Sequence, residues 1–200
     1  VHGLGSGKTL TAITTSQCYL EKYPDDKVVV ITPASLIKNF QQEMEKWGVE
    51  NMDKYEFFTF DSFKNMPSNC KNSLLIIDEA HNLRTKIKIT DKDKKSIGKA
   101  KIKVVGDGAN TSSKKSKEKK SNGLKAAEII HCAKHARRVL MLTGTPAVNT
   151  LYDLENLMAM SYGRDPLTPA KFEDEMSKNI ENYFKCRISF FTPAKEHFPP

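Results

Sequence analysis

The 200-residue sequence lacks three features that would place it in a specialised class of proteins. No apolar run approaches the about 20 residues of a membrane-spanning helix, so neither a membrane span nor a membrane partner is predicted. No signal-peptide pattern precedes the first motif. The four cysteines, Cys18, Cys70, Cys132 and Cys186, form no C-x-x-C pair. This spacing favours reduced thiols in an intracellular protein over a disulfide framework.

Basic residues are concentrated in one segment of the chain. Lys and Arg number 32 against 24 Asp and Glu, a net charge of +8. Residues 86–121 contain 13 Lys and four acidic residues, a balance of +9, which leaves −1 for the rest. We predict that this Lys-rich, low-complexity tract is an insertion. It is either a solvated surface loop or an arm that contacts nucleic acid.

The first nine residues, VHGLGSGKT, predict a phosphate-binding loop. Gly5 and Gly7 allow the backbone to curl so that successive N–H groups point toward phosphate oxygens. Lys8 is then placed to bind the β- and γ-phosphates, and the Thr9 hydroxyl is placed to ligate Mg²⁺. The positive end of the following helix dipole adds to the same site. The usual pattern of such a loop is G-x-x-x-x-G-K-[ST]. Here His2 stands at its first position, where the pattern has glycine. The alternative is a glycine-rich turn before an ordinary helix. The predicted nucleotide contacts are Gly3, Leu4, Gly5, Ser6, Gly7, Lys8 and Thr9.

Strand-like and helical segments alternate, which predicts an α/β fold with a central parallel sheet flanked by helices. Strands are expected over residues 28–31, 55–60, 73–77 and 139–142. Helices are expected over residues 9–23, 35–47, 124–137 and 151–162, followed by a helix over 172–184 and a strand over 187–191. Ser35 is the expected cap of the second helix, and Trp47 is expected in the core. All candidate motifs follow strands, where functional loops of such sheets lie.

Asp78-Glu79-Ala80-His81 directly follows an apolar run. Nucleotide hydrolysis needs Mg²⁺ near the γ-phosphate and a base that orients water. Asp78 suits the metal and Glu79 suits the base. Two adjacent acids after a buried strand are costly to place without a nearby cation. Alone, the pair is equally typical of a solvated loop, but a phosphate-binding loop about 70 residues upstream favours the catalytic interpretation.

Three stretches together resemble motifs I, II and III of superfamily 2 helicases and translocases. They are Gly5-Ser6-Gly7-Lys8-Thr9, Asp78-Glu79-Ala80-His81 and Thr143-Gly144-Thr145-Pro146. Residues 32–40 and 59–61 resemble motifs Ia and Ib of the Snf2-like branch, and residues 142–157 resemble the region after its motif III. Residues 2–9 also resemble the transcription ATPases of large nucleocytoplasmic DNA viruses, of the nucleoside triphosphatase I and early transcription factor types.

The resemblance implies a RecA-like lobe that uses ATP and Mg²⁺ over residues 1–162. Residues 163–200 are then a C-terminal extension toward a second lobe. Lys8 binds phosphate, Thr9 and Asp78 hold the metal, and Glu79 is the base. His81 is implied to couple this site to motif III, through Thr143, Gly144 and Thr145.

The resemblance also implies a nucleic-acid partner, with DNA favoured over RNA. Family members contact the phosphate backbone, which predicts salt-sensitive and sequence-tolerant binding. The residues that match these contacts are Thr32, Pro33, Ala34 and Thr59. Other implied partners are a second lobe and the transcription machinery, and the expected location is the nucleus or a viral factory or virion.

Several parts of the family pattern lie outside this sequence. They are the strand before motif I, the adenine-reading Gln motif and the second lobe with its arginine finger. We therefore expect a fragment of a longer protein that hydrolyses ATP poorly alone, since such a finger contributes about 10³–10⁵ in rate.

Two other functions stay open at this point. A lone lobe could serve as a non-catalytic module that binds nucleotide or a partner, although the intact acidic pair argues against decay of the site. An unrelated P-loop protein such as a kinase is disfavoured by motifs Ia and III. His131 and His135 are spaced to share a helix face with a metal, but no third ligand at suitable spacing is visible, so packing or surface roles are preferred.

Overall fold

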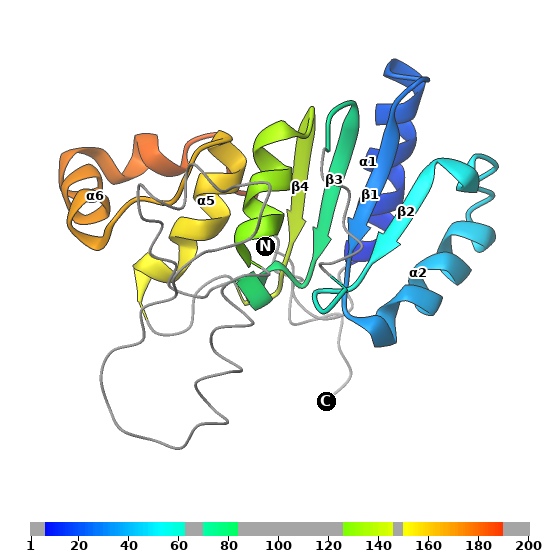
Figure 1. Ribbon diagram of the computed structural model, residues 1–200, viewed down its shortest axis with the longest axis horizontal. Coiled ribbons are helices and arrows are strands. Elements are labelled where there is room, and N and C mark those ends of the chain that lie inside the picture. Colours follow the sequence, from blue (N-terminus) through cyan, green and yellow to red (C-terminus); the bar gives the residue numbers. More distant parts are fainter. Residues whose placement is uncertain (1–6, 63–69, 84–125, 146–149, 190–200) are drawn as a thin grey trace, which may run out of the picture.

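The computed structural model describes residues 7–62, 70–83, 126–145 and 150–189. Its centre is a four-stranded sheet of order β2-β1-β3-β4 (Figure 1). The strands are β1 (Lys27–Ile31), β2 (Tyr55–Phe58), β3 (Ser73–Asp78) and β4 (Arg138–Leu142). All three strand pairs are parallel. The predicted α/β fold with a central parallel sheet is confirmed.

Helices cover both faces of this sheet. They are α1 (Lys8–Lys22), α2 (Ala34–Lys46), a helix over residues 126–135, α5 (Glu155–Tyr162) and α6 (Pro169–Phe184). Short 3-10 turns add η1 (Met52–Lys54), η3 (Ala80–Leu83) and η4 (Leu151–Leu154). Figure 1 shows α2 beside the β2 end of the sheet, and α5 and α6 beside the β4 end. No helix among these is long and apolar enough to cross a lipid bilayer.

Alternate residues of the central strands enter two separate cores. Val28, Val30 and Ile76 pack with α1 and α2, whereas Val29 and Ile77 pack with the helix over residues 126–135, α5 and α6. Because successive side chains of a strand point to opposite faces, strands covered on both sides must be apolar throughout. This explains the unbroken apolar runs of β1 and β3.

The second helix differs from its prediction at both ends. It begins at Ala34 after Pro33, with no side-chain cap, so the capping role predicted for Ser35 is wrong. Trp47 is 52% exposed, so its predicted place in the core is wrong as well. Gly48 reverses the chain in the left-handed region, with φ 69°, and Val49 then donates to the Met44 carbonyl and fills the core position instead.

Smaller differences occur elsewhere. Strand β2 ends at Phe58, two residues early, because Thr59 and Ser62 exchange hydrogen bonds in a turn. Residues 187–189 form no strand, while residues 190–191 lie outside the described part of the chain. Thr150 does begin the next helical segment, in a capping box with Asp153.

Helix α6 packs on the same core as the sheet. Phe172 and Tyr183 are buried in the cluster that contains β3 and α5. Glu155 of α5 is 1% exposed, and it accepts hydrogen bonds from Arg164 (2.6 Å), the Leu167 N–H (2.6 Å) and the Tyr183 hydroxyl. The network satisfies a buried carboxylate and fixes α6 against α5. The domain boundary at residue 162 stays a prediction.

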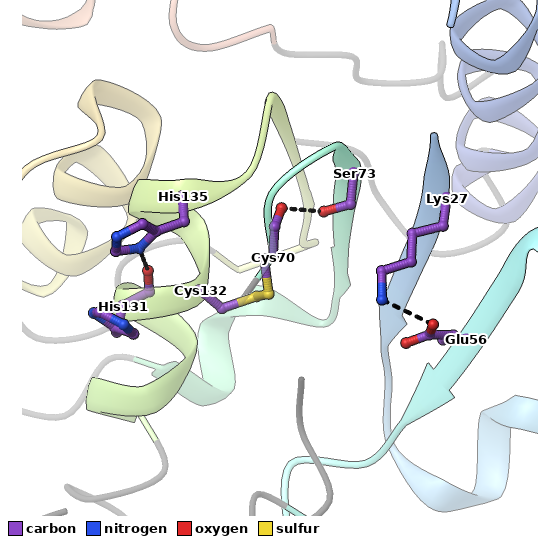
Figure 2. The surroundings of a disulfide bond; sticks show 7 residues. All are labelled: Lys27, Glu56, Cys70, Ser73, His131, Cys132 and His135. Atoms are coloured by element: carbon purple, nitrogen blue, oxygen red, sulfur yellow. Dashed lines mark hydrogen bonds and ion pairs between the residues drawn. A yellow bond between two sulfur atoms is a disulfide. The ribbon is translucent and has the colours of Figure 1, made fainter. Parts of the chain in front are cut away.

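Cys70 and Cys132 form a disulfide (Figure 2), so the predicted absence of disulfide pairing is wrong. Cys70 lies just before β3, and Cys132 lies on the helix over residues 126–135, which packs on the same face of the sheet. Their Cα atoms are 5.2 Å apart, although 62 positions separate them in the chain. Tertiary packing creates the pair, so spacing along the sequence could not indicate it. Cys18 and Cys186 are exposed and free.

The disulfide should contribute strongly to stability. For a separation of 62 residues, chain entropy predicts a contribution of about 4 kcal/mol. Urea unfolding of Cys132→Ser, or of the wild type with dithiothreitol, is expected to show a loss of this order. Cys18→Ser is the matched control and should unfold like the wild type. Equal unfolding midpoints with and without the reductant would contradict this contribution.

A second polar cluster joins α1 to the amino ends of the strands. Asp26 is buried and accepts hydrogen bonds from the Tyr19 hydroxyl and from Arg137 Nε, the latter at 2.7 Å. Burial alone would raise the pKa of Asp26, but the hydrogen bonds from Arg137 and Tyr19 outweigh it and lower that pKa below its usual value. The cluster therefore stabilises the fold through an ionised carboxylate.

The stabilisation by Asp26 should depend on pH. Because its pKa is lower in the folded state, the contribution is complete above the unfolded pKa of about 4 and is lost as the pH falls through the folded value. Asp26→Asn should reduce the free energy of unfolding by roughly 2 kcal/mol near neutral pH, and by less in acid. Urea titrations across this pH range measure the difference in the free energy of unfolding between Asp26→Asn and the wild type. A difference that does not change with pH would contradict the prediction.

Candidate functional site

The candidate site lies where β1, β3 and β4 end. Helix α1 begins here at Lys8, directly after Gly7, whose φ of 76° places it in the left-handed region that favours glycine. Lys8 Nζ donates to Glu79 Oε1 at 3.0 Å. The two side chains are only 16% and 23% exposed. The predicted phosphate-binding lysine and the predicted base therefore form an ion pair in this structure.

Glu79 occupies a strained backbone position. Its φ is 51°, which is uncommon for a residue other than glycine. Asn82 holds the turn, because its backbone N–H and its side-chain Nδ2 donate to the Glu79 carbonyl at 3.0 and 2.9 Å. Such strain persists only where the surrounding structure enforces it, and it clusters at functional sites.

His81 connects Glu79 to the loop after β4. Its Nδ1 lies 3.1 Å from Glu79 Oε2 and 3.3 Å from Thr143 Oγ1. The Thr143 hydroxyl in turn accepts the Thr145 N–H at 3.2 Å, across the half-buried Gly144. An unbroken series of polar contacts therefore runs from Lys8 to Thr145. The structure brings together the described residues of all three stretches that the sequence singled out.

Asp78 ends β3 and is 7% exposed. Its Oδ1 accepts the Glu79 N–H at 3.0 Å, and its Oδ2 accepts the Thr32 hydroxyl at 3.2 Å. Burial and, secondly, the charge of Glu79 raise the pKa of Asp78 despite these donors. A divalent cation would relieve both effects. The Asp78 carboxylate and the Thr9 hydroxyl near the start of α1 are oxygen ligands of the kind that Mg²⁺ prefers, so the donor set fits this metal.

A groove of about 300 Å³ opens beside this site. It is lined by Pro33, Ala34, Thr59, Phe60, Asp61, Asn82 and Leu83. Three of the four residues predicted to contact nucleic acid therefore lie together. Thr32 does not join them: it is 0% exposed and its hydroxyl is bonded to Asp78, so a phosphate contact by this side chain is contradicted. Asn82 was not identified from the sequence, because only the fold shows that it reaches both the groove and Glu79.

Some predicted residues lie outside the described part of the chain. They are Gly3, Leu4, Gly5 and Ser6 of the phosphate-binding loop, Pro146, and the Lys-rich tract over residues 86–121. His135 Nδ1 is hydrogen-bonded to the His131 carbonyl at 2.8 Å, within their helix. Among the residues that are described, no group of three or more His, Cys, Asp or Glu is arranged to hold a metal.

Comparison with known proteins agrees with this architecture. The chain is 27% identical over 191 residues to L538 of Acanthamoeba polyphaga mimivirus, provisionally named an ATP-dependent RNA helicase, covering 90% of this chain and 34% of the relative. It is 26% identical over 239 residues to 087L of Invertebrate iridescent virus 3, provisionally named a helicase, covering 94% of this chain and 21% of the relative. The chain thus spans a fifth to a third of the length of these viral relatives.

A solved structure has the same fold. It is the SWI2/SNF2 ATPase core of Sulfolobus solfataricus in complex with dsDNA, with a TM-score of 0.50 and 17% identity. The likeness covers 91% of this chain and 35% of that one. The SNF2-related domain family model matches residues 1–190. The chain therefore belongs to the SNF2-related domain family of superfamily 2 and has the RecA-like fold of its first lobe.

Proposed function

We propose that this chain is the ATP-binding first lobe of a DNA-dependent ATPase whose full-length form couples hydrolysis to movement along duplex DNA. The observation that carries the proposal is the series of contacts from Lys8 through Glu79 and His81 to Thr143. It joins the start of α1, the acidic strand end and the loop after β4 in one polar site.

The ion pair suggests how nucleotide would be used. Phosphate oxygens at the start of α1 would compete with Glu79 for Lys8, because both are anions within reach of one ammonium group. Glu79, once released, is free to orient water as a base. Mg²⁺, when bound, neutralises developing phosphate charge. Asp78 and Thr9 are the residues that would hold it.

Coupling to nucleic acid would run through two routes. His81 contacts both Glu79 and Thr143, so a change in the Glu79 position alters the loop after β4. Asn82 lines the groove with Pro33 and Thr59 and also donates to the Glu79 carbonyl. A phosphate backbone in the groove would thus act on the same turn that carries the base.

The choice of nucleic acid is part of the proposal. The Sulfolobus neighbour is in complex with dsDNA, whereas the mimivirus relative is provisionally named an RNA helicase. We favour duplex DNA, as in the Snf2-like branch. Since three of the relatives are viral proteins, a role in viral transcription, in the nucleus or in a viral factory, extends the same proposal.

Gly7 offers a test of the nucleotide site with a matched control. Gly7 and Gly163 have φ of 76° and 66°, and a Cβ at either would meet no atom within 4 Å. Each Gly→Ala change should therefore cost roughly 1 kcal/mol of stability through backbone strain alone. Only Gly7→Ala should also weaken ATP binding, measured by calorimetry. Equal ATP affinity of the two variants would remove Gly7 from the site.

The proposed activity is tested by ATP hydrolysis in the parent protein, with no nucleic acid, duplex DNA or RNA. Duplex DNA should stimulate the rate, and Lys8→Ala should abolish it. Glu79→Gln should still bind ATP but turn over about 10²–10⁴-fold more slowly, as expected for loss of a base. Lys22→Ala, at the other end of α1, is the control and should match the wild type.

Binding of ATP without turnover, under any nucleic acid, would instead identify a non-catalytic binding module. The isolated chain is expected to bind nucleotide weakly and to show no translocation. Measurable movement of the isolated chain along DNA would contradict the need for a second lobe.

A further inference from the structure

Thr32 carries a buried hydroxyl that has no role in the phosphate chemistry described above. It follows β1 directly and is 0% exposed. Its backbone N–H donates to the Phe58 carbonyl at 3.1 Å, which fixes the residue against β2. Its hydroxyl donates to Asp78 Oδ2 at 3.2 Å. Both ends of this hydrogen bond are therefore held by the sheet.

The strand register explains why these two residues meet. Ile31 of β1 pairs with Ile77 of β3, so the next residue of each strand lies at the same end of the sheet. A hydroxyl at position 32 reaches the carboxylate, whereas an aliphatic side chain of the same shape would leave Oδ2 without this donor. Ser keeps the donor, and Val keeps the shape.

The two oxygens of Asp78 are held by donors from different elements. Oδ1 accepts the N–H of Glu79, within the strained turn, and Oδ2 accepts Thr32 from the neighbouring strand. One donor alone would let the carboxylate rotate about its side-chain bond, while two fix its plane. A carboxylate oxygen accepts more than one interaction, so both keep capacity for a cation.

We propose that Thr32 is a positioning residue that orients the Asp78 carboxylate for Mg²⁺ bound with nucleotide. The inference rests on the proposed function of Asp78 as a metal ligand. Partners that orient ligands in this way typically change metal affinity by 10–100-fold when removed. Thr32 thereby acts on the metal from the strand whose next residues, Pro33 and Ala34, line the groove.

The test compares Thr32→Val with Thr32→Ser in the parent protein. ATP affinity is measured by calorimetry at saturating Mg²⁺ and again in excess EDTA. Mg²⁺ should increase the ATP affinity of Thr32→Val about 10-fold less than it increases that of the wild type. In EDTA the two proteins should bind ATP equally well. Thr32→Ser should retain the wild-type gain. Hydrolysis by Thr32→Val should need more Mg²⁺ for half-maximal rate but approach the wild-type rate at saturation.

A control separates positioning from general destabilisation. Ser16 is also fully buried, and its hydroxyl donates to the Ile13 carbonyl at 2.7 Å, away from the site. Ser16→Ala should lower the melting temperature without changing the Mg²⁺-dependent gain.

Three results would overturn the inference. If Mg²⁺ increases the ATP affinity of Thr32→Val as much as that of the wild type, Thr32 has no positioning role, although the proposed function stands. The same conclusion follows if Thr32→Val loses ATP affinity equally with and without Mg²⁺. Wild-type protein that binds no ATP would overturn the proposed function and the role of Thr32 with it.

Discussion

The parallel placement of β3 between β1 and β4 is the constraint on which the site depends. Every residue of β3 is buried, and each neighbour pairs with it in register to the last residue. Parallel strands end at a common edge, so their following residues meet without any sequence proximity. Thr32 meets Asp78 in this way, and Thr143 meets His81 just beyond the end of β3. A register shift of one residue between β1 and β3 would turn the Asp78 side chain away from Thr32.

The same edge concentrates negative charge, and the fold balances it locally. Asp78 and Glu79 are adjacent, and burial of the first makes its ionised form costly. Lys8 offsets part of this cost through Glu79, while backbone and hydroxyl donors satisfy Asp78. On the nucleotide-binding role proposed above, phosphate oxygens would take the place of the Glu79 carboxylate at the same ammonium group. Charge at this edge would then stay balanced with and without nucleotide.

Sequence reasoning predicted the parts of this structure that local patterns determine. Apolar runs located all four strands of the described sheet, and the acidic pair was placed correctly at the end of β3. Sequence reasoning failed where tertiary packing decides the position of a side chain. Trp47 fits a helical stripe, but the helix ends one residue earlier and Val49 takes the core position. Thr32 resembles a nucleic-acid contact by position, but its side-chain direction depends on a strand that pairs from 46 residues away.

A long segment between two fixed points of a domain need not disturb its sheet. The described chain leaves the core at Leu83 and returns at Ala126, and both residues are buried in one hydrophobic cluster. The entropy cost of closing a loop rises only with the logarithm of its length, so added residues between two fixed ends cost little. The Cys70–Cys132 bond spans the same interval and links the two sides covalently. The two ends of this interval are thereby held together by the hydrophobic cluster and by the disulfide.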